Sequence, residues 1–440
     1  MIKRIFLSKA FCLSLFFLCI APSQARTQTP LETQPDTLLR LTDLLIELGT
    51  SNPELLASRL ETQELSLQSD RVSTLPDPSI RAMYQPAPVL TARGAQRSQW
   101  SIEQAIPYPG KLRLKGSIAY HTAQIKGFET EAFEKDLHLQ VKEAYFTIYR
   151  IQQQRAHILA FIERLNSFES ISTTRYEVGA GIQQDILKTQ LERNALSLLL
   201  LELSSQRHAA SQTLSRLLNR PLPTTFTVTV DSVDQLSLDA IHLFDQASTL
   251  RPEVHALEIA SERADDQLAL ALKQSRPDFK IGLTYFDIAK ADVPHTATGR
   301  DAFGIGATVQ IPLHRRPRRA QVEQARLQRR QIEARQEALF TSITTDIQDL
   351  VYQLSERARQ LELLEQSLIP QSEITLQATL GSYSTGATHF LDLLDSERTL
   401  FSHRMHYEDT YTQYLLLIAT LERALGVDSL SDLIADDLQP

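Results

Sequence analysis

Few residues in this chain are arranged for covalent chemistry. The sequence lacks the Gly-x-Ser-x-Gly nucleophile motif, the Gly-x-x-x-x-Gly-Lys phosphate loop, the His-Glu-x-x-His zinc motif and a dinucleotide-binding fingerprint. His403 and His406 lie three residues apart, a spacing at which two imidazoles on one helix face can bind a metal, but no third ligand is adjacent. We interpret them as a surface pair, and we predict no enzyme, no cofactor and no metal site.

Two carboxylates stand out by their spacing. Asp392 and Asp395 are at positions i and i+3, shortly after a Tyr-x-x-Gly segment at residues 383–386. On their own, acids at this place indicate the solvated first turn of a helix, because the helix dipole favours negative charge there.

The first 25 residues have the pattern of an export signal. Three basic residues precede an apolar run at residues 10–20 and a small-residue cleavage site that ends at Ala25. The run is shorter than the ~18 to 20 apolar residues that a spanning helix needs. Cys12 and Cys19 both lie inside it, so we predict a mature chain without thiols, disulfides or a lipid anchor.

Composition bounds the class of protein. Removal of this segment takes the formal net charge from -8 to about -11, because three positive and no negative charges are lost. An acidic balance argues against nucleic acid as a partner. The chain has only 14 glycines among 440 residues, which suits long uninterrupted helices.

The chain is similar to itself at a shift of about 207 residues. The Tyr-x-x-Gly-Ala segment at residues 176–180 recurs at residues 383–387, and matches continue downstream without a gap. We predict two tandem structural repeats, at residues 26–230 and 231–440, each ordered as helix, two strands, very long helix, turn and helix.

The very long helices are predicted at residues 110–176 and 317–383, where apolar residues alternate at spacings of four and three, as in a coiled coil. We expect Pro370 to kink or break the second one. The returning helix at residues 182–219 is shorter, so segments 37–73 and 252–275 are expected to cover the remaining length. The seam residues include Leu137, Val141, Ala144, Ile148 and Ile151 in the first segment, and Ile343, Ile347, Leu350 and Leu354 in the second.

Period-two alternation marks four strands. Residues 279–285 and 303–311 alternate apolar with polar side chains, and residues 80–84 and 100–106 do so less cleanly. Alternation over ~10 residues fits a transmembrane barrel strand with one lipid-facing side. The same pattern also fits a soluble hairpin with one buried face.

Four strands are too few for a closed barrel, since ~8 is the smallest number that fills its own interior. An open sheet edge is not tolerated in lipid. If these strands lie in a membrane, the protein must therefore be an oligomer to which each subunit contributes four strands.

Three motifs resemble the TolC-like outer membrane factor family. They are Asn-Pro-Glu-Leu at 52–55, Leu-Pro-Asp-Pro at 75–78 and the segment at 104–112 that contains Pro-Tyr-Pro-Gly-Lys-Leu. The last motif most resembles the heavy-metal efflux branch, and the likeness covers nearly the whole mature chain.

The resemblance implies a mainly α fold with a membrane β-barrel: a homotrimer with a twelve-stranded outer-membrane barrel and a periplasmic α-helical barrel of coiled-coil helices. It implies the outer membrane of a Gram-negative bacterium, with most of the mass in the periplasm. It also implies a passive exit duct for small toxic solutes, heavy-metal cations included, with a periplasmic adaptor and an RND-type inner-membrane transporter as partners.

The same resemblance gives the tips a role. Asp392 and Asp395 match a carboxylate ring that closes the duct, where crowded like charges repel and attract cations. Tyr383 matches a residue whose hydroxyl bonds an aspartate, here Asp185, and by internal symmetry Tyr176 and Asp392 are a second candidate pair. At Thr388 the best-known members have an arginine, so the strength of this latch is in doubt.

Three glycines are expected at the turns between antiparallel helices, where a tight or left-handed backbone is needed. They are Gly179, Gly181 and Gly386. Adaptor contact through these tips is implied by the resemblance.

A basic cluster flanks Pro317 where the second long helix begins. It can meet phosphate headgroups, or it can be a solvated turn. Its members are Arg315, Arg316, Arg318 and Arg319.

Two alternative functions stay open. The same architecture can serve as a duct for protein or peptide secretion. A periplasmic coiled-coil scaffold without a pore is the third hypothesis, although a scaffold would need no amphipathic strands.

Overall fold

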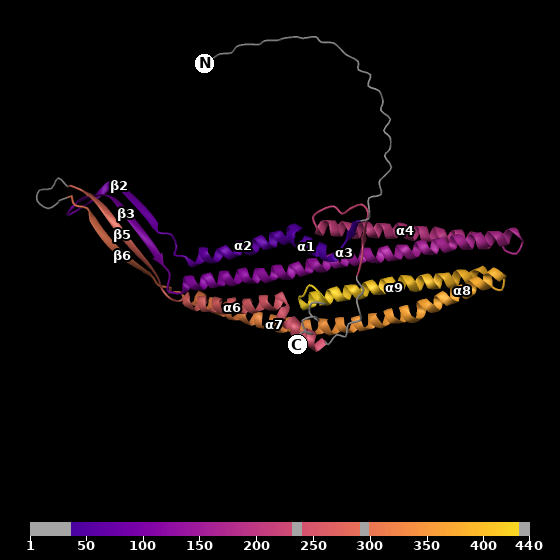
Figure 1. Cartoon of the computed structure of the whole chain (residues 1–440). Helices are drawn as coiled ribbons and strands as arrows, with labels where there is room; N and C mark the ends of the chain where they lie inside the picture. The colour runs from indigo at the N-terminus through magenta and orange to yellow at the C-terminus, as the bar shows by residue number, and fades with distance from the viewer. Residues whose placement is uncertain (1–36, 231–239, 291–298, 431–440) are drawn as a thin grey trace, which may run out of the picture.

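The computed structural model describes residues 37–230, 240–290 and 299–430. The predicted signal peptide at residues 1–25, with Cys12 and Cys19, lies outside them. The molecule is elongated, with a four-stranded sheet at one end and helical hairpins that extend to the other (Figure 1). No helix among the described residues is long and apolar enough to cross a membrane.

Helix α3 (Lys111–Glu177) is the axis of the molecule. Its 67 residues correspond to ~100 Å, and it runs beside α2 (Pro53–Ser73) near the sheet and beside α4 (Gln183–Leu217) toward the tip (Figure 1). The predicted long helix at 110–176 is thus confirmed. The predicted seam is buried, since Leu137, Val141 and Ile148 are at most 1% exposed.

The second long segment is broken where proline was expected to break it. Helix α7 (Arg315–Leu363) passes into a π-helical turn, η1 (Leu364–Leu368), and continues as α8 (Ile369–Thr385). Pro370 follows directly, and because it has no backbone N–H it cannot complete the regular α-helical ladder. Helix α9 (Phe390–Leu425) then returns along α7 and α8.

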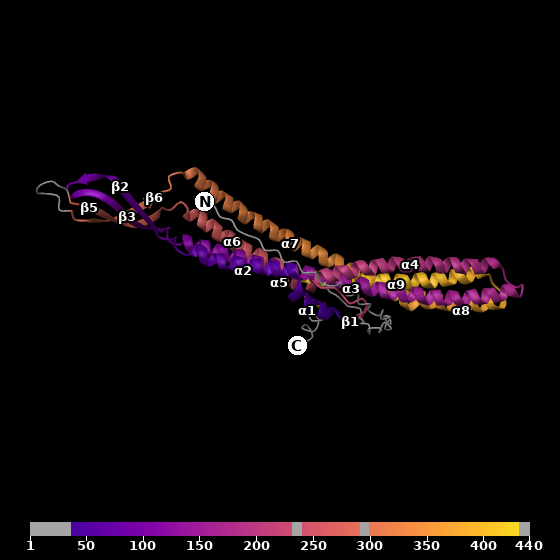
Figure 2. The ribbon, with the colours of Figure 1, turned by 90° about the horizontal axis from the view of Figure 1, so that it is seen from above.

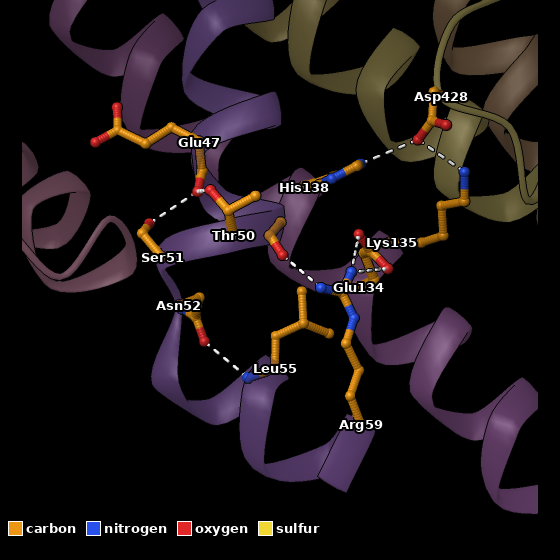
Figure 3. Close-up of polar contacts among 11 residues, drawn as sticks. Glu47, Thr50, Ser51, Asn52, Leu55, Arg59, Glu134, Lys135, His138 and Asp428 are labelled. Atoms are coloured by element: carbon orange, nitrogen blue, oxygen red, sulfur yellow. Dashed lines mark hydrogen bonds and ion pairs between the residues drawn. The ribbon is translucent and has the colours of Figure 1, made fainter. Parts of the chain in front are cut away.

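The segment at 37–73 is not one continuous cover. It forms strand β1 (Thr37–Leu39), helix α1 (Leu41–Ser51) and helix α2, with a break at Asn52. The Asn52 side chain accepts a hydrogen bond from the Leu55 N–H at 2.9 Å and donates one to the Leu217 carbonyl at 2.9 Å. Figure 3 shows the first of these bonds at the start of α2. Pro53 then occupies the first helical position, where its missing N–H costs nothing.

The middle of the molecule holds a small parallel pair of strands. Strand β4 (Phe226–Val228) pairs there with β1. The second half continues with α5 (Ala240–Leu250) and α6 (Pro252–Lys273), and α6 packs on both α3 and α7. The tandem repeat and its boundaries at residues 26–230 and 231–440 stay a prediction.

Three buried clusters follow one another between the helices. One lies around α1, α3 and α4 at mid-length, one lies toward the tip, and one joins α5, α7 and α9. The core is therefore a series of helix-to-helix seams, which holds two hairpin tips at a fixed distance from the sheet.

Candidate functional site

The four predicted strands form one antiparallel sheet. They are β2 (Ser79–Thr91), β3 (Gly94–Ile106), β5 (Asp278–Ala289) and β6 (Ala302–Gln310), in the order β2-β3-β5-β6. The strands from the two halves of the chain thus meet through β3 and β5, and β2 and β6 are the two edges.

The register places most apolar side chains of the four strands on one face. Opposite residues of an antiparallel pair share a face. Ile102 pairs with Ile80 on one side and with Leu283 on the other, and Leu283 pairs with Ile305. The same face includes Tyr84, Trp100, Phe279, Ile281, Tyr285, Phe303 and Val309.

None of the described residues covers this apolar face. Ile305 is 87% exposed and Ile80 is 73% exposed. The opposite face has mainly polar or small residues, among them Gln99, Lys280 and Thr308, although Met83 and Phe286 also lie on it. A continuous apolar face of this size marks a surface that contacts lipid or protein, and the unpaired edges at β2 and β6 offer backbone groups to further strands.

The sheet is fixed to the helices by a buried lysine. Lys111 is 3% exposed, and its Nζ donates hydrogen bonds to Asp278 Oδ1 at 2.9 Å and to the Arg276 carbonyl at 3.1 Å. The same carboxylate oxygen accepts from the Tyr108 N–H at 2.7 Å. The turn that enters α3 is therefore tied to the turn that enters β5.

The far end of the molecule is formed by two turns. Gly179 lies between α3 and α4 with φ 74°, and Gly386 lies between α8 and α9 with φ 82°. This left-handed region favours glycine. A Cβ on Gly181 would lie 3.1 Å from the Tyr176 nitrogen, so close backbone approach requires a small residue there.

Tyr383 is buried between the two hairpins rather than exposed at the tip. It is 2% exposed, its hydroxyl shares a 3.0 Å hydrogen bond with Ser172 Oγ, and its ring packs edge-on against Phe390. Within the described residues it makes no hydrogen bond with Asp185. The Tyr383–Asp185 and Tyr176–Asp392 pairs remain predictions, and Tyr176 is 49% exposed.

Arg175 joins the two turns. Its guanidinium donates to the Tyr383 carbonyl through Nη1 and to the Ala180 carbonyl through Nη2, at 3.2 Å for the latter. Its Cζ also lies 4.9 Å from the centre of the Tyr383 ring, within cation–π range. Sequence reasoning missed this residue, although an arginine at 175 against Ser382 at the equivalent repeat position is a visible difference.

Asp392 caps the start of α9. Its carboxylate accepts a hydrogen bond from Thr388 Oγ1 at 2.6 Å and another from the His389 N–H at 3.2 Å. The Thr388 hydroxyl and then the His389 N–H hold the pKa of Asp392 below its usual value. Asp395 is exposed one turn along the same helix. Thr388 stands where the best-known family members have an arginine. Here its hydroxyl donates a hydrogen bond to the carboxylate that caps α9.

Asp185 has the opposite electrostatic environment. It is half-buried beside the first turn of α4. Burial raises the pKa of its carboxyl, and attraction from Lys188, Arg175 and His389 offsets only part of that effect. The two tip carboxylates are therefore tuned in opposite directions.

Polar contacts link the hairpins between the tip and mid-length. Glu192 on α4 pairs with Arg398 on α9, with Arg398 Nε 3.0 Å from Glu192 Oε1. Arg164 on α3 lies 2.5 Å from the fully buried Glu397. These ion pairs cross from one hairpin to the other, as does the apolar cluster toward the tip.

The histidine pair does not converge on a common point. His403 shares a 2.8 Å hydrogen bond with Ser372 Oγ, whereas His406 is exposed. Among residues 37–230, 240–290 and 299–430, no three His, Cys, Asp or Glu side chains are grouped as metal ligands.

Solved outer-membrane channels share this fold. A crystal structure of CusC has a TM-score of 0.74 and 17% identity. The match covers 93% of this chain and 99% of that chain. The VceC outer membrane protein of Vibrio cholerae has a TM-score of 0.72 and 17% identity, with 88% and 96% covered. The fold is thus the one found in solved outer-membrane channels, with a sheet at one end of a long helical body.

Sequence comparisons also find outer-membrane and efflux proteins. Residues 243–427 match the family described as outer membrane efflux protein. The cobalt-zinc-cadmium resistance protein CzcC of Cupriavidus metallidurans is 23% identical, with 84% of this chain and 85% of that protein covered. The outer membrane protein TolC of Vibrio cholerae is 20% identical, with 90% and 92% covered. The chain is thus similar to outer membrane efflux proteins of the TolC-like family, with heavy-metal resistance proteins among its relatives.

Proposed function

We propose that this protein is the outer-membrane exit duct of a tripartite efflux pump. The observation that carries the proposal is the sheet: four strands with one continuous apolar face and two unpaired edges, placed at the end of long helical hairpins. In lipid, an open edge leaves backbone groups unsatisfied. Association of several copies, edge β2 to edge β6, closes the sheet into a barrel.

Three copies give the architecture that the family resemblance implies. Twelve strands then form the membrane barrel, and the hairpins of three subunits form the wall of a periplasmic duct. A barrel of twelve strands is wide enough to leave an open lumen, whereas about eight are filled by their own side chains. The duct itself performs no catalytic step.

The cargo is proposed to include heavy-metal cations. Support comes from the relative named for cobalt, zinc and cadmium resistance and from the structural likeness to CusC. A periplasmic adaptor that docks on the tip turns at Gly179, Gly181 and Gly386, and an RND-type inner-membrane transporter, are the proposed partners.

The gate is proposed at the tip. In a trimer Asp392 and Asp395 contribute six carboxylates around one axis, where they attract cations and resist crowding. Asp392 can cap α9 and at the same time face the axis of the trimer. Capping uses only part of the acceptor capacity of its carboxylate. Arg175 is proposed to hold the two turns of each subunit together in the closed state, beside the predicted Tyr383–Asp185 and Tyr176–Asp392 links.

A secretion duct for proteins or peptides is the second candidate, since it would use the same architecture. Efflux is favoured by the relative named for metal resistance. A coiled-coil scaffold without a pore is disfavoured, because it leaves the apolar sheet face without a role.

Lipid contact of the sheet tests the proposal. The only cysteines, Cys12 and Cys19, precede the described residues, so single cysteines can be introduced at Ile305 on the apolar face and at Thr308 on the polar face. A fluorophore on each is exposed to quencher-labelled lipid in reconstituted vesicles. Strong quenching at Ile305 and weak quenching at Thr308 is expected. Equal, weak quenching at both sites would remove the barrel from the proposal.

A further inference from the structure

A cluster of unneutralised arginines lies where β6 ends and α7 begins. We call residues 315–319 the arginine turn; it contains Arg315, Arg316, Arg318 and Arg319. With the described residues, none of the four forms an ion pair, and the polar contact of the cluster is from Arg318 to Gln321 at 3.4 Å. The nearest acid along the helix, Glu323, pairs with Arg326 at 3.4 Å.

The position of these charges is unfavourable for the chain alone. The first turn of α7 has no acidic residue and its N-cap has no side-chain hydrogen bond. The N-terminal end of a helix carries partial positive charge, and neighbouring like charges on one helix repel. The arginine turn therefore does not stabilise the helix in which it lies, and an external anion would neutralise it.

Apolar surface adjoins the arginine turn. Ile311 and Leu313, directly before it, are 63% and 79% exposed. A groove of about 620 Å³ lies between α6 and α7, with Leu272 and Val322 contributing its apolar lining. Three arginines, Arg318, Arg319 and Arg326, line the same groove, together with Glu323, which is paired with Arg326. One surface thus offers cationic and apolar contacts side by side.

The arginine turn lies where the sheet joins the helical body. Figure 2 shows α7 starting at the junction between the sheet and the helical body. If the apolar sheet face is in lipid, this junction is at the depth of the headgroups. Arginine is suited to that depth, because its guanidinium binds phosphate in a bidentate manner and its stem tolerates apolar surroundings.

We propose that the arginine turn, with the adjoining groove between α6 and α7, binds the phosphate of anionic phospholipids in the periplasmic leaflet. Leu272 and Leu313 then contact the upper part of the acyl chains. Charge complementarity and the adjacent apolar surface favour a lipid over free phosphate, which has no apolar part. The inference rests on the membrane placement of the sheet proposed above.

Native mass spectrometry can measure this preference. The full-length oligomer in a nonionic detergent is offered an equimolar mixture of phosphatidylglycerol and phosphatidylcholine. Each basic residue near an anionic lipid surface is worth roughly fivefold in affinity. Replacement of all four arginines by glutamine is expected to lower phosphatidylglycerol retention at least tenfold, whereas replacement by lysine retains most of it.

A matched variant controls for total charge. It carries four Arg→Gln changes on the same helix, away from the sheet, at Arg330, Arg335, Arg357 and Arg359. This control is expected to retain phosphatidylglycerol like the wild type. An equal loss in the control, no preference in the wild type, or displacement by millimolar inorganic phosphate would overturn the proposal. So would dissociation of the oligomer by the glutamine variant, which would assign the arginines to a subunit contact.

Failure of this inference is separable from failure of the duct. The same preparations are tested for ionic current in a planar bilayer. Current without a lipid preference overturns only the headgroup site. Absence of current from every preparation, the wild type included, contradicts the duct, and the headgroup site falls with it.

Discussion

At the residue scale, Arg175 links the two tips by hydrogen bonds and a cation–π contact. Arg175→Ala removes two hydrogen bonds from a charged donor and one cation–π contact. Loss of one such charged hydrogen bond without a replacement lowers the free energy of unfolding by roughly 2 kcal/mol. We expect faster hydrogen exchange in residues 176–182 and 383–389 and a higher single-channel conductance.

Arg155→Ala is the matched control for this change. Arg155 is exposed on the same helix, and no hydrogen bond or ion pair of it with described residues is found. Its loss should leave exchange and conductance unchanged. Identical behaviour of the two variants would show that Arg175 does not hold the tips.

Asp185 and Asp392 should respond to pH with opposite signs. The pKa of Asp185 is raised above its usual 3.8 by burial, so its ionisation costs stability as pH rises through the raised value. Asp185→Asn should therefore raise the thermal midpoint at pH 7 and have no effect below pH 3.8. Asp392 has a lowered pKa, so its stabilising contribution is present above 3.8 and is lost as pH falls through the lowered value.

Thermal unfolding at several pH values checks this pair. Asp392→Ala should lower the midpoint at pH 7, and its deficit should shrink in acid as the wild-type carboxylate becomes protonated. A destabilised Asp185→Asn at pH 7 would contradict the assignment of a buried, costly charge at that position.

At the tip, the turn glycines could be predicted from the sequence, whereas the contacts of Arg175 and Tyr383 could not. Glycines with positive φ follow from turn chemistry, and the predicted turns contain them. Arg175 binds backbone carbonyls, which carry no sequence signature. The hydroxyl of Tyr383 bonds Ser172 because α8 packs on α3 there, a contact that only three-dimensional placement reveals.

At the element scale, periodic patterns were sufficient where they were long. Residues 110–176 and the four strands were predicted because each repeats its pattern over many residues. The break at Asn52 was missed although Asn-Pro is visible, since the buried bond to the Leu217 carbonyl is a long-range contact.

Asn52→Ala should weaken the joint between α1 and α2. Asn52 is 4% exposed, and its side chain both caps α2 and satisfies a carbonyl of α4. A loss of about 1 to 2 kcal/mol is expected, because a cap is removed and the carbonyl loses its partner. Thr50 lies nearby in the last turn of α1 (Figure 3) and is exposed, so Thr50→Ala should cost less than about 0.5 kcal/mol.

Chemical unfolding of the detergent-solubilised protein measures both variants. Equal midpoints for Asn52→Ala and Thr50→Ala would show that the joint is held by the apolar cluster around α1 and not by this amide.

At the scale of the whole molecule, the proposed function depends on two distant ends, the sheet and the hairpin tips. The sheet and the tips are separated by the length of α3, and in the proposed duct each end is completed by neighbouring subunits. Sequence alone indicated an oligomer on the condition that the strands lie in a membrane, because four strands with open edges are not tolerated in lipid. The number of copies came from the family resemblance, since no feature of one chain counts its neighbours.

Mass measurement should find three copies. Native mass spectrometry or light scattering of the detergent complex is expected to give a trimer, which closes twelve strands. A stable monomer that inserts into vesicles would contradict closure by association.

Ionic current through a planar bilayer tests the central claim most directly. The wild-type trimer is predicted to give discrete, low conductance steps that divalent cations on the tip side reduce. Asp392→Ala with Asp395→Ala should raise the conductance and weaken that block. A well-folded, membrane-inserted oligomer that passes no current, even when both aspartates are replaced, would contradict the account of this protein as a gated duct.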